Sequence, residues 1–507
     1  MRVYQFRHQR AAAILATTSV ADRPQLRYRA VLELCEEAVA AALGAGASYA
    51  DARVVVRRSQ VVGTRNRRVE RLDDSETQGI GVRVLVDGAW GFAGERQLDA
   101  TGAQEAARKA VAFAKAAPGG HVRALASVEP ARGEFRTVVD RDPFSVPVAE
   151  KVELCLRAEE ALQHEEVKVT SASVRAQREH KLFVSSDGAS TEQEIVECGG
   201  GVDALAARDG VTQIRSYPSA HGGSSAQAGW EFVDQLGLER EAPRVGEQAS
   251  ALLRADQCPS GVTTVVIDAE QTGLQVHESV GHPTELDRVY GTEAAYAGTS
   301  FVKADDLGSL RYGSEHMNIT ADSTTPSGLG SFAFDDEGVP AGREPVVREG
   351  ILSGFLTSRE TAARIGSGSG GSMRADSWSR MPLVRMTNLH LEPGEGSLDE
   401  LIAGVDEGVF LQTNKSWSID DKRLNFQFGT QIAWEIKGGE LGRMLRDATY
   451  TGQTPVFWGS LDAVAGPEEW TLHGLTNCGK GQPGQHAHVS HGAPPARFRN
   501  VQVGFRQ

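Results

Sequence analysis

Two histidines and a glutamate stand close together in residues 276–283, which read Val-His-Glu-Ser-Val-Gly-His-Pro. Neutral imidazoles of His277 and His282 could hold a zinc ion, and the Glu278 carboxylate could take a proton from a metal-bound water. The familiar zinc helix spaces its histidines four residues apart, whereas the spacing here is five. Five steps of about 100° leave the two rings about 140° apart, so a regular helix could not direct both at one ion. A π-turn, or a helix that breaks at Gly281, could bring them together.

A third candidate ligand, Cys478, lies near the C-terminus in the sequence Asn-Cys-Gly-Lys-Gly. A thiol among small, turn-forming residues with a lysine nearby is expected to be accessible and to favour the thiolate. Two histidines and one cysteine make a three-ligand zinc site with an open fourth position for water. The alternatives are two unrelated polar residues at a helix end and a free surface thiol in a glycine-rich turn.

Further motifs accompany these residues in a fixed order. They are G-I-G-V-R-V-L-V-D-G at 79–88 with W-G-F-A at 90–93, D-D-E-G at 335–338, M-P-L-V-R-M-T-N at 381–388 and C-G-K at 478–480. Together with H-E-S-V-G-H they resemble the TldD side of the TldD/PmbA family of metallopeptidases, from about residue 30 to residue 503. The PmbA-type paralogues lack the metal motif, so the hexad places this chain on the catalytic side of the family.

The resemblance implies a zinc-dependent peptidase that hydrolyses peptides or unfolded polypeptide segments in the cytoplasm. His277, His282 and Cys478 would hold Zn²⁺. Glu278 would take the proton of the metal-bound water as it attacks a peptide carbonyl, and then return it to the leaving amine. An extended peptide could bind by pairing with a sheet edge.

The resemblance also implies a PmbA-type paralogue as the partner in a heterodimer, with a homodimer as the other arrangement. Two other functions stay open. One is a zinc-stabilised scaffold, which would need no Glu278, and the other is a hydrolase of a non-peptide amide.

The composition limits the class of protein. A net charge of −14 argues against nucleic acid or an anionic membrane surface as the main partner. Hydrophobic residues make up 40% and charged residues 24% of the chain, as in ordinary soluble proteins. Five scattered cysteines suggest no disulfide framework and fit a reducing compartment. No apolar run approaches the ~20 residues of a membrane span.

Helical patterns come in separate blocks from runs of strands, which predicts an α+β fold with largely antiparallel sheets. We expect an N-terminal α+β domain over 26–256 and a C-terminal, β-rich metallopeptidase domain over 257–507, where the resemblance places the metal. Residues 1–25 are expected to be a disordered extension, or to follow from an upstream start codon, because their apolar patch is too short for a good export signal.

The patterns predict particular elements. Helices are expected at 26–43, 100–116, 148–164, 398–405 and 449–463, and at 230–253 with an interruption near Pro243. A helix beginning near Glu270 carries the hexad. Strands are expected at 51–58, 60–64, 67–72, 79–86, 167–177, 181–185, 192–198, 201–208, 262–267, 318–322, 331–334, 424–436 and 500–503. Residues 291–310 are expected to form a loop over the site, and the Gly/Ser-rich stretch at 366–372 a flexible loop.

A histidine cluster follows the cysteine. His486, His488 and His491 could add ligands or bind a second metal, but a solvated loop is the favoured interpretation. Asp335 and Asp336 could orient the N–H groups of the ligand histidines, or could simply form a turn at a strand end.

Four other residues could also serve the site. Glu285 and Asp287 could touch substrate or orient the ligands, or could lie in an exposed loop. Met381 and Met386 are expected in the core, because thioethers suit Cu(I) rather than Zn²⁺.

Overall fold

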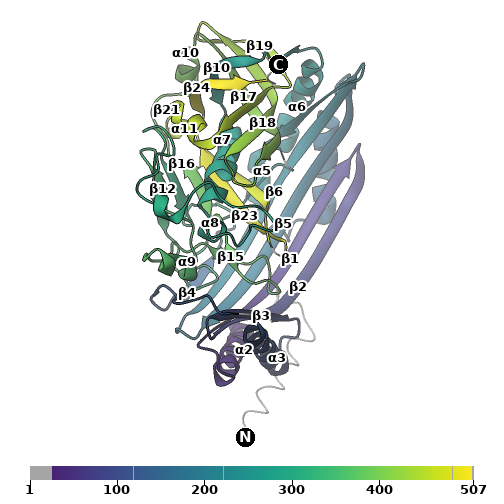
Figure 1. Ribbon diagram of the computed structural model, residues 1–507. Coiled ribbons are helices and arrows are strands. Elements are labelled where there is room, and N and C mark those ends of the chain that lie inside the picture. The colour runs from purple at the N-terminus through teal and green to yellow at the C-terminus, as the bar shows by residue number, and fades with distance from the viewer. Residues whose placement is uncertain (1–24, 118, 221, 482, 505–507) are drawn as a thin grey trace.

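The computed structural model describes residues 25–117, 119–220, 222–481 and 483–504. In this part of the chain the fold is α+β, and most strand pairs are antiparallel, as predicted. Figure 1 shows the long strands of the N-terminal half running diagonally on one side and the C-terminal strands and helices on the other. The expectation for residues 1–24 lies outside the described residues. None of the described helices is long and apolar enough to cross a membrane.

An eight-stranded sheet forms the N-terminal half, in the order β3-β2-β1-β5-β6-β4, with β7 and β8 also paired to β6. Its strands are β1 Tyr49–Arg65, β2 Arg68–Val86, β3 Ala89–Glu95, β4 Arg132–Arg136, β5 Val167–Ser185, β6 Ser190–Arg208, β7 Val211–Tyr217 and β8 Ser224–Ala226. Its helices are α2 Gln25–Gly44, α3 Ala100–Ala116, α4 Val148–Ala161, α5 Trp230–Leu236 and α6 Leu238–Leu252. One buried cluster lies under α2 and α3, and another lies under α4, α5 and α6.

The long strands differ from the prediction, which divided each of them in two. The polar residues at the expected breaks do not end a strand, because partners across the sheet satisfy them. Glu179, at the expected break in β5, for example, accepts from Arg57 Nη2 on β1 at 2.5 Å. Similarly, α5 ends at Gly237, which has a left-handed φ of 59°, whereas Pro243 lies inside α6.

Two sheets form the C-terminal half, with α7 (Ala269–Val276) between them. The first has the order β17-β10-β24-β20-β18-β19-β9, with β21 paired to β24. Its strands are β9 Asp256–Gln257, β10 Gly261–Ile267, β17 Glu407–Ile419, β18 Asn425–Lys437, β19 Glu440–Arg446, β20 Thr449–Gln453, β21 Leu461–Val464 and β24 Ala496–Val503. The second has the order β13-β12-β11-β16-β23-β22. Its strands are β11 Ile319–Asp322, β12 Arg343–Arg348, β13 Ile351–Leu352, β16 Asn388–Leu391, β22 Thr471–Lys480 and β23 Gln485–Ala493.

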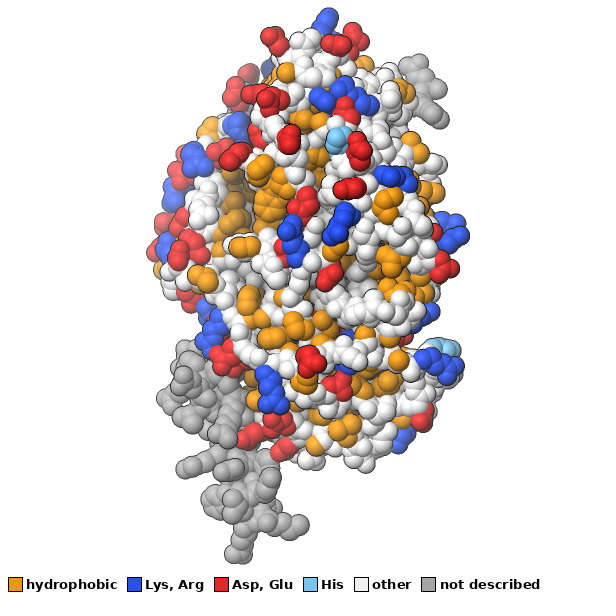
Figure 2. All heavy atoms as spheres, turned by 90° about the vertical axis from the view of Figure 1, so that its left-hand side faces the viewer, with side chains coloured by type: hydrophobic (Ala, Val, Ile, Leu, Met, Phe, Trp, Pro, Cys, Tyr) orange, Lys and Arg blue, Asp and Glu red, His pale blue; other side chains and the backbone are white. Residues whose placement is uncertain are grey.

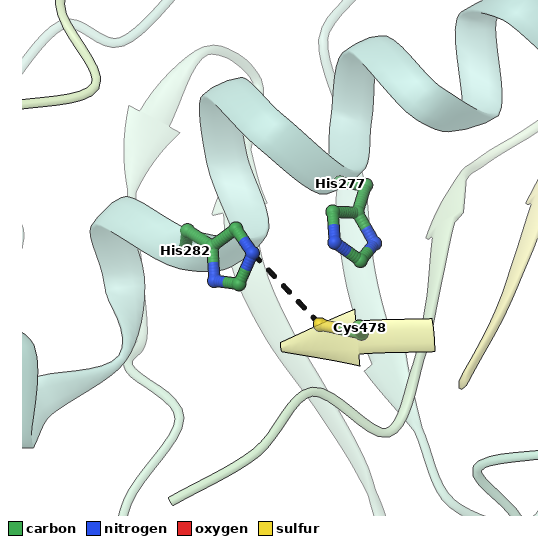
Figure 3. A group of neighbouring side chains, drawn as sticks. All are labelled: His277, His282 and Cys478. Carbon is green, nitrogen blue, oxygen red and sulfur yellow. Dashed lines mark hydrogen bonds between the residues drawn. The ribbon is translucent and has the colours of Figure 1, made fainter. Parts of the chain in front are cut away.

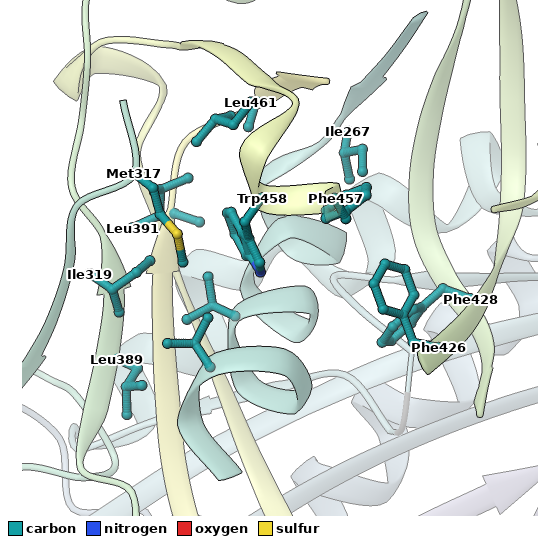
Figure 4. Packing of buried hydrophobic residues seen from close by; sticks show 14 of the residues in the cluster. Ile267, Met317, Ile319, Leu389, Leu391, Phe426, Phe428, Phe457, Trp458 and Leu461 are labelled. Atoms are coloured by element: carbon teal, nitrogen blue, oxygen red, sulfur yellow. The ribbon is translucent and has the colours of Figure 1, made fainter. Parts of the chain in front are cut away.

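The largest hydrophobic cluster surrounds α7. Figure 4 shows Trp458 and Phe457 against this helix, with aliphatic side chains from β11 and β16 on one side and Phe426 and Phe428 from β18 on the other. This packing holds α7 in place, and it therefore sets the position of the residues that follow the end of the helix. The remaining short elements are α8 Leu286–Val289, α9 Arg359–Arg364, α10 Leu398–Ala403, α11 Thr454–Gly459, β14 Met373–Arg374 and β15 Leu383–Val384.

The predicted helix at 449–463 is wrong. Pro455 lies in the first turn of the short helix α11, where its missing N–H costs nothing, and the segments on both sides are strands β20 and β21. Residues 331–334 are not a strand either. The backbone N–H groups of Ala333 and Phe334 instead donate to the Gln193 side chain of the N-terminal sheet.

The two halves dock through buried charges. Arg83 on β2 pairs with Asp51 at 2.6 Å and with Glu337 at 2.9 Å, and all three side chains are 1% exposed. Lys181 on β5 reaches Asp336 at 2.8 Å. Asp335 accepts from backbone N–H groups of its own loop and of Met373. Asp336 therefore joins the two halves and Asp335 holds its own loop in place, and these contacts do not orient the histidines.

Charges of both signs are mixed on the face shown in Figure 2, which is the left-hand side of Figure 1. Lysine and arginine side chains alternate with aspartate and glutamate around hydrophobic patches. The described part of this face therefore carries no field of a single sign.

Candidate metal centre

The helix that carries the hexad changes its pitch at the first histidine. α7 begins at Asp268, whose side chain accepts from the backbone of Gln271, and continues as a π-helix over His277–Gly281. The His282 N–H donates to the His277 carbonyl, five residues back, and a 3₁₀ turn with Pro283 follows. The wider π-turn places residues five apart on one side, as the spacing predicts.

Gly281 allows Met386 to pack closely against this turn. A Cβ at this position would overlap the sulfur of Met386, which is fully buried. Met386 thus packs in the core, as predicted, and lies against the helix at Gly281. Met381 is half-buried, and its carbonyl accepts from Gln485.

The turn brings His277, His282 and Cys478 together (Figure 3). Their candidate ligand atoms all lie within 4.8 Å of one another, and Cys478 Sγ is 3.8 Å from His282 Nε2. Zinc–ligand distances in a tetrahedral site imply a sulfur–nitrogen separation of about 3.6 Å. The three side chains therefore fit a single zinc ion, with small adjustments.

The position of Cys478 differs from the prediction. It lies on strand β22, is 3% exposed, and is not in an accessible turn. Of the two glycines that suggested a turn, Gly479 lies within β22 and Gly481 belongs to the β22–β23 connection.

The charge around Cys478 favours its thiolate. Burial raises the pKa of the thiol, but the Arg385 guanidinium and the His282 imidazole outweigh this effect, so its pKa lies below the ordinary value. Arg385 also donates to the Cys478 carbonyl. At the other four cysteines, burial raises the pKa to about 12. Cys478 is therefore the cysteine suited to bind a metal.

Burial favours the neutral form of both candidate ligand histidines. Burial lowers the pKa of His277 to about 4 and also lowers that of His282. His282 Nδ1 lies 3.0 Å from Glu285 Oε2, which leaves Nε2 facing Cys478. Glu285 is fully buried, yet Lys480 and His282 bring its pKa well below the ordinary value. Of the two interpretations of Glu285, orientation of a ligand is the one that the structure supports.

His491 orients the other histidine. His277 Nδ1 lies 2.6 Å from His491 Nε2, and His491 is 4% exposed on β23. The solvated-loop interpretation is therefore wrong for this residue. Because successive strand residues face opposite sides, His488 points the other way, to Glu197 of the N-terminal sheet at 2.5 Å. Only His486, of the three, is exposed.

Glu278 stands next to the ligand group without belonging to it. Its side chain is almost buried, and its Oε2 accepts a hydrogen bond of 2.6 Å from Arg423 Nη1. Asp287 instead forms an ion pair of 2.8 Å with Lys480, the last residue of β22. It therefore helps to fix the end of the strand that carries Cys478.

Models of one protein family match most of the chain. The PmbA/TldA metallopeptidase domain 1 matches residues 50–114, the central domain 141–255 and the C-terminal domain 260–505. The chain belongs to the PmbA/TldD family of metallopeptidases.

Relatives in this family carry names that agree with the geometry. A metalloprotease of Methanothermobacter thermautotrophicus is 30% identical over 90% of this chain and 95% of its own length. A zinc metalloprotease TldD homolog of Saccharolobus solfataricus is 25% identical over 64% of this chain and 69% of its own.

Solved structures share the fold. A Thermotoga maritima protein superposes with a TM-score of 0.74 at 21% identity, over 93% of this chain and 99% of its own. TldE from Thermococcus kodakarensis gives 0.69 at 14% identity, over 93% and 100%.

Arg423 and Arg385 had no signal in the sequence as functional groups, and His491 was a candidate metal ligand rather than a group that orients His277. Arg423 reaches Glu278 across 145 positions, and His491 reaches His277 across 214. Arg385 lies within the M-P-L-V-R-M-T-N motif, but nothing in that motif indicates a contact with a cysteine carbonyl. Only the tertiary fold brings these pairs together.

Proposed function

We propose that this chain is a zinc-dependent peptidase in which His277, His282 and Cys478 hold the metal and Glu278 is the general base. The observation that supports this most is a group of three ligand atoms within 4.8 Å of one another, with a carboxylate on the adjacent residue. Zinc in this site would act as a Lewis acid that lowers the pKa of water and polarises a carbonyl.

The chain's own residues then supply the remaining steps. Glu278 takes a proton from the attacking water and passes it to the nitrogen of the leaving amine. Glu285 and His491 hold the rings of His282 and His277 in place through their Nδ1 atoms. A structural zinc site would need these two orienting contacts, but it would not need a carboxylate beside a ligand.

The substrates that we propose are peptides or unfolded polypeptide segments in the cytoplasm, on the basis of the family.

A peptide needs an opening to reach the site, because the three proposed ligands are each at most 4% exposed. Residues 291–301 lie at the site: Tyr296 packs on Gly481, and the Thr299 and Phe301 N–H groups donate to residues 421 and 422. We propose that this segment moves to admit substrate.

The partner that we propose is a PmbA-type paralogue. This proposal rests on the family resemblance, and TldE from Thermococcus kodakarensis supports only the fold that the two chains would share. A homodimer of this chain is the other arrangement.

The ligand set is tested by metal analysis and by removal of the metal. Purified protein should hold about one zinc per chain. Dialysis against a chelator should abolish peptide cleavage, and added zinc should restore it.

Cys478→Ser should lose most of the zinc, whereas the matched variant Cys258→Ser, at a buried cysteine outside the site, should keep it. Full zinc occupancy and activity in Cys478→Ser would remove the thiolate from the ligand set.

A further inference from the structure

Arg423 is held in an unusual backbone conformation beside the proposed base. It ends the turn between β17 and β18 with a φ of +62°, a left-handed conformation that side-chain-bearing residues rarely adopt. Such conformations persist where the surroundings enforce them, and they concentrate at functional sites.

Several hydrogen bonds enforce this turn. The Arg423 N–H donates to the Asp420 carbonyl at 2.8 Å, and the Asp420 side chain accepts from the Leu424 N–H at 2.8 Å. Thr454 Oγ1 donates to the Arg423 carbonyl at 2.9 Å. Both the N–H and the carbonyl of Arg423 are therefore held by hydrogen bonds. Its side chain extends to Glu278, in the π-turn that follows α7.

The guanidinium has unused hydrogen-bonding capacity. Nη1 donates to Glu278 Oε2 at 2.6 Å, and the side chain is 15% exposed. Nε is buried and has no hydrogen-bond partner among the described residues. A guanidinium carries five N–H donors, and a buried donor without a partner costs free energy unless a ligand completes it.

Other cations near the site contact other groups. Lys480 and Arg288 pair with Glu285, and Arg385 donates to the Cys478 carbonyl, although Arg288 Nη2 and Arg385 Nε also lack a partner among the described residues. Arg423 differs from them because it contacts the proposed base, Glu278, directly.

We propose that Arg423 is a catalytic residue that stabilises the oxyanion of the tetrahedral intermediate; this rests on the proposed function above. As the water oxygen bonds to the carbonyl carbon, the π electron pair moves onto the carbonyl oxygen and the water proton moves to Glu278. The guanidinium then donates to the new oxyanion. When the C–N bond breaks, the electron pair returns to the carbonyl and Glu278 protonates the amine.

Before substrate arrives, the same guanidinium holds the Glu278 carboxylate in place. Protonation of Glu278 during attack weakens that ion pair at the moment when the oxyanion forms, so the positive charge becomes available where it is needed. Fixed donors of this kind act without reorganisation, which is the reason that they favour the transition state over the bound substrate.

Three variants test this assignment in the zinc-loaded protein. Arg423→Ala should lower kcat by about 100-fold or more with little change in KM, because a single oxyanion donor is typically worth that much. Arg423→Lys should recover part of the loss. Lys422→Ala, on the same turn but exposed, should match the wild type. Zinc content should be equal in all three, and a phosphinic peptide, which mimics the tetrahedral anion, should bind Arg423→Ala more weakly by the same factor as kcat/KM, by calorimetry.

The possible outcomes separate the inference from the function on which it rests. If Arg423→Ala keeps kcat within about threefold of wild type while Glu278→Gln is inactive, the oxyanion role is wrong and the peptidase stands. If the loss appears only with peptides that have a free C-terminal carboxylate, and not with their amides, Arg423 binds that carboxylate and the inference is again wrong. If wild-type protein loaded with zinc cleaves no peptide, either alone or with a PmbA-type paralogue, the proposed function itself fails.

Discussion

At the scale of single residues, neutral imidazoles and a buried carboxylate define the site. The two ligand histidines are oriented by different groups: a carboxylate, Glu285, for His282, and an imidazole, His491, for His277. Partners of this kind fix the ring of a metal ligand and its tautomer, and their loss weakens metal binding. The His277–His491 contact is the less common arrangement and can be tested alone.

His491→Ala should reduce zinc affinity by about 10- to 100-fold while the fold remains intact. The physical reason is that His277 loses the group that holds Nδ1 and hence the direction of Nε2. Competition with a chromophoric zinc chelator measures this change without any assay of activity. His486→Ala is the matched control, because His486 is exposed on the same strand and should leave the affinity unchanged. Unchanged affinity in His491→Ala would show that the contact does not position the ligand.

At the scale of elements, the π-turn decides whether the two histidines can meet. The spacing excludes a regular helix, which would point the rings apart, and leaves a π-turn or a break at Gly281; the structure has the π-turn. The same reasoning could not place Cys478 on a strand or His491 next to His277. Both positions depend on the packing of β22 and β23 against α7. Contacts between segments so far apart in the chain leave no local pattern in the sequence.

Gly281→Ala should destabilise the turn. The added methyl group would overlap the Met386 sulfur, and overpacking of a core typically costs about 1–3 kcal/mol. Zinc affinity should fall as well, because the turn aligns His277 with His282. Chemical denaturation and zinc competition measure the two effects.

A double-mutant cycle assigns the cause of that loss. Met386→Ala should relieve part of the penalty of Gly281→Ala, which would make the two effects non-additive. Gly459→Ala is the control, since a Cβ at that exposed position has nothing within 4 Å. Strict additivity of Gly281→Ala and Met386→Ala would contradict a direct clash.

At the scale of the whole molecule, the motifs divide into two roles. The H-E-S-V-G-H and C-G-K motifs form the site, whereas D-D-E-G and the glycines at 79 and 81 form the contact between the halves. A Cβ on Gly79 would overlap the ring of Trp378. The sequence predicts the α+β class and most elements. The long strands, the split of 449–463 and the buried ion pairs Arg83–Asp51 and Lys181–Asp336 follow from contacts between distant segments. The predicted division at 256 and 257 remains a prediction.

Turnover per bound zinc in wild type and in Glu278→Gln tests whether Glu278 performs chemistry at a zinc site. Glutamine keeps the shape and loses the base, so the variant should retain its zinc and its thermal stability yet cleave peptide at least ~100-fold more slowly. Glu315→Gln, an exposed control, should match wild type. Both should be assayed alone and with a PmbA-type paralogue. Cleavage by Glu278→Gln at the wild-type rate per zinc would contradict the assignment of Glu278 as the base.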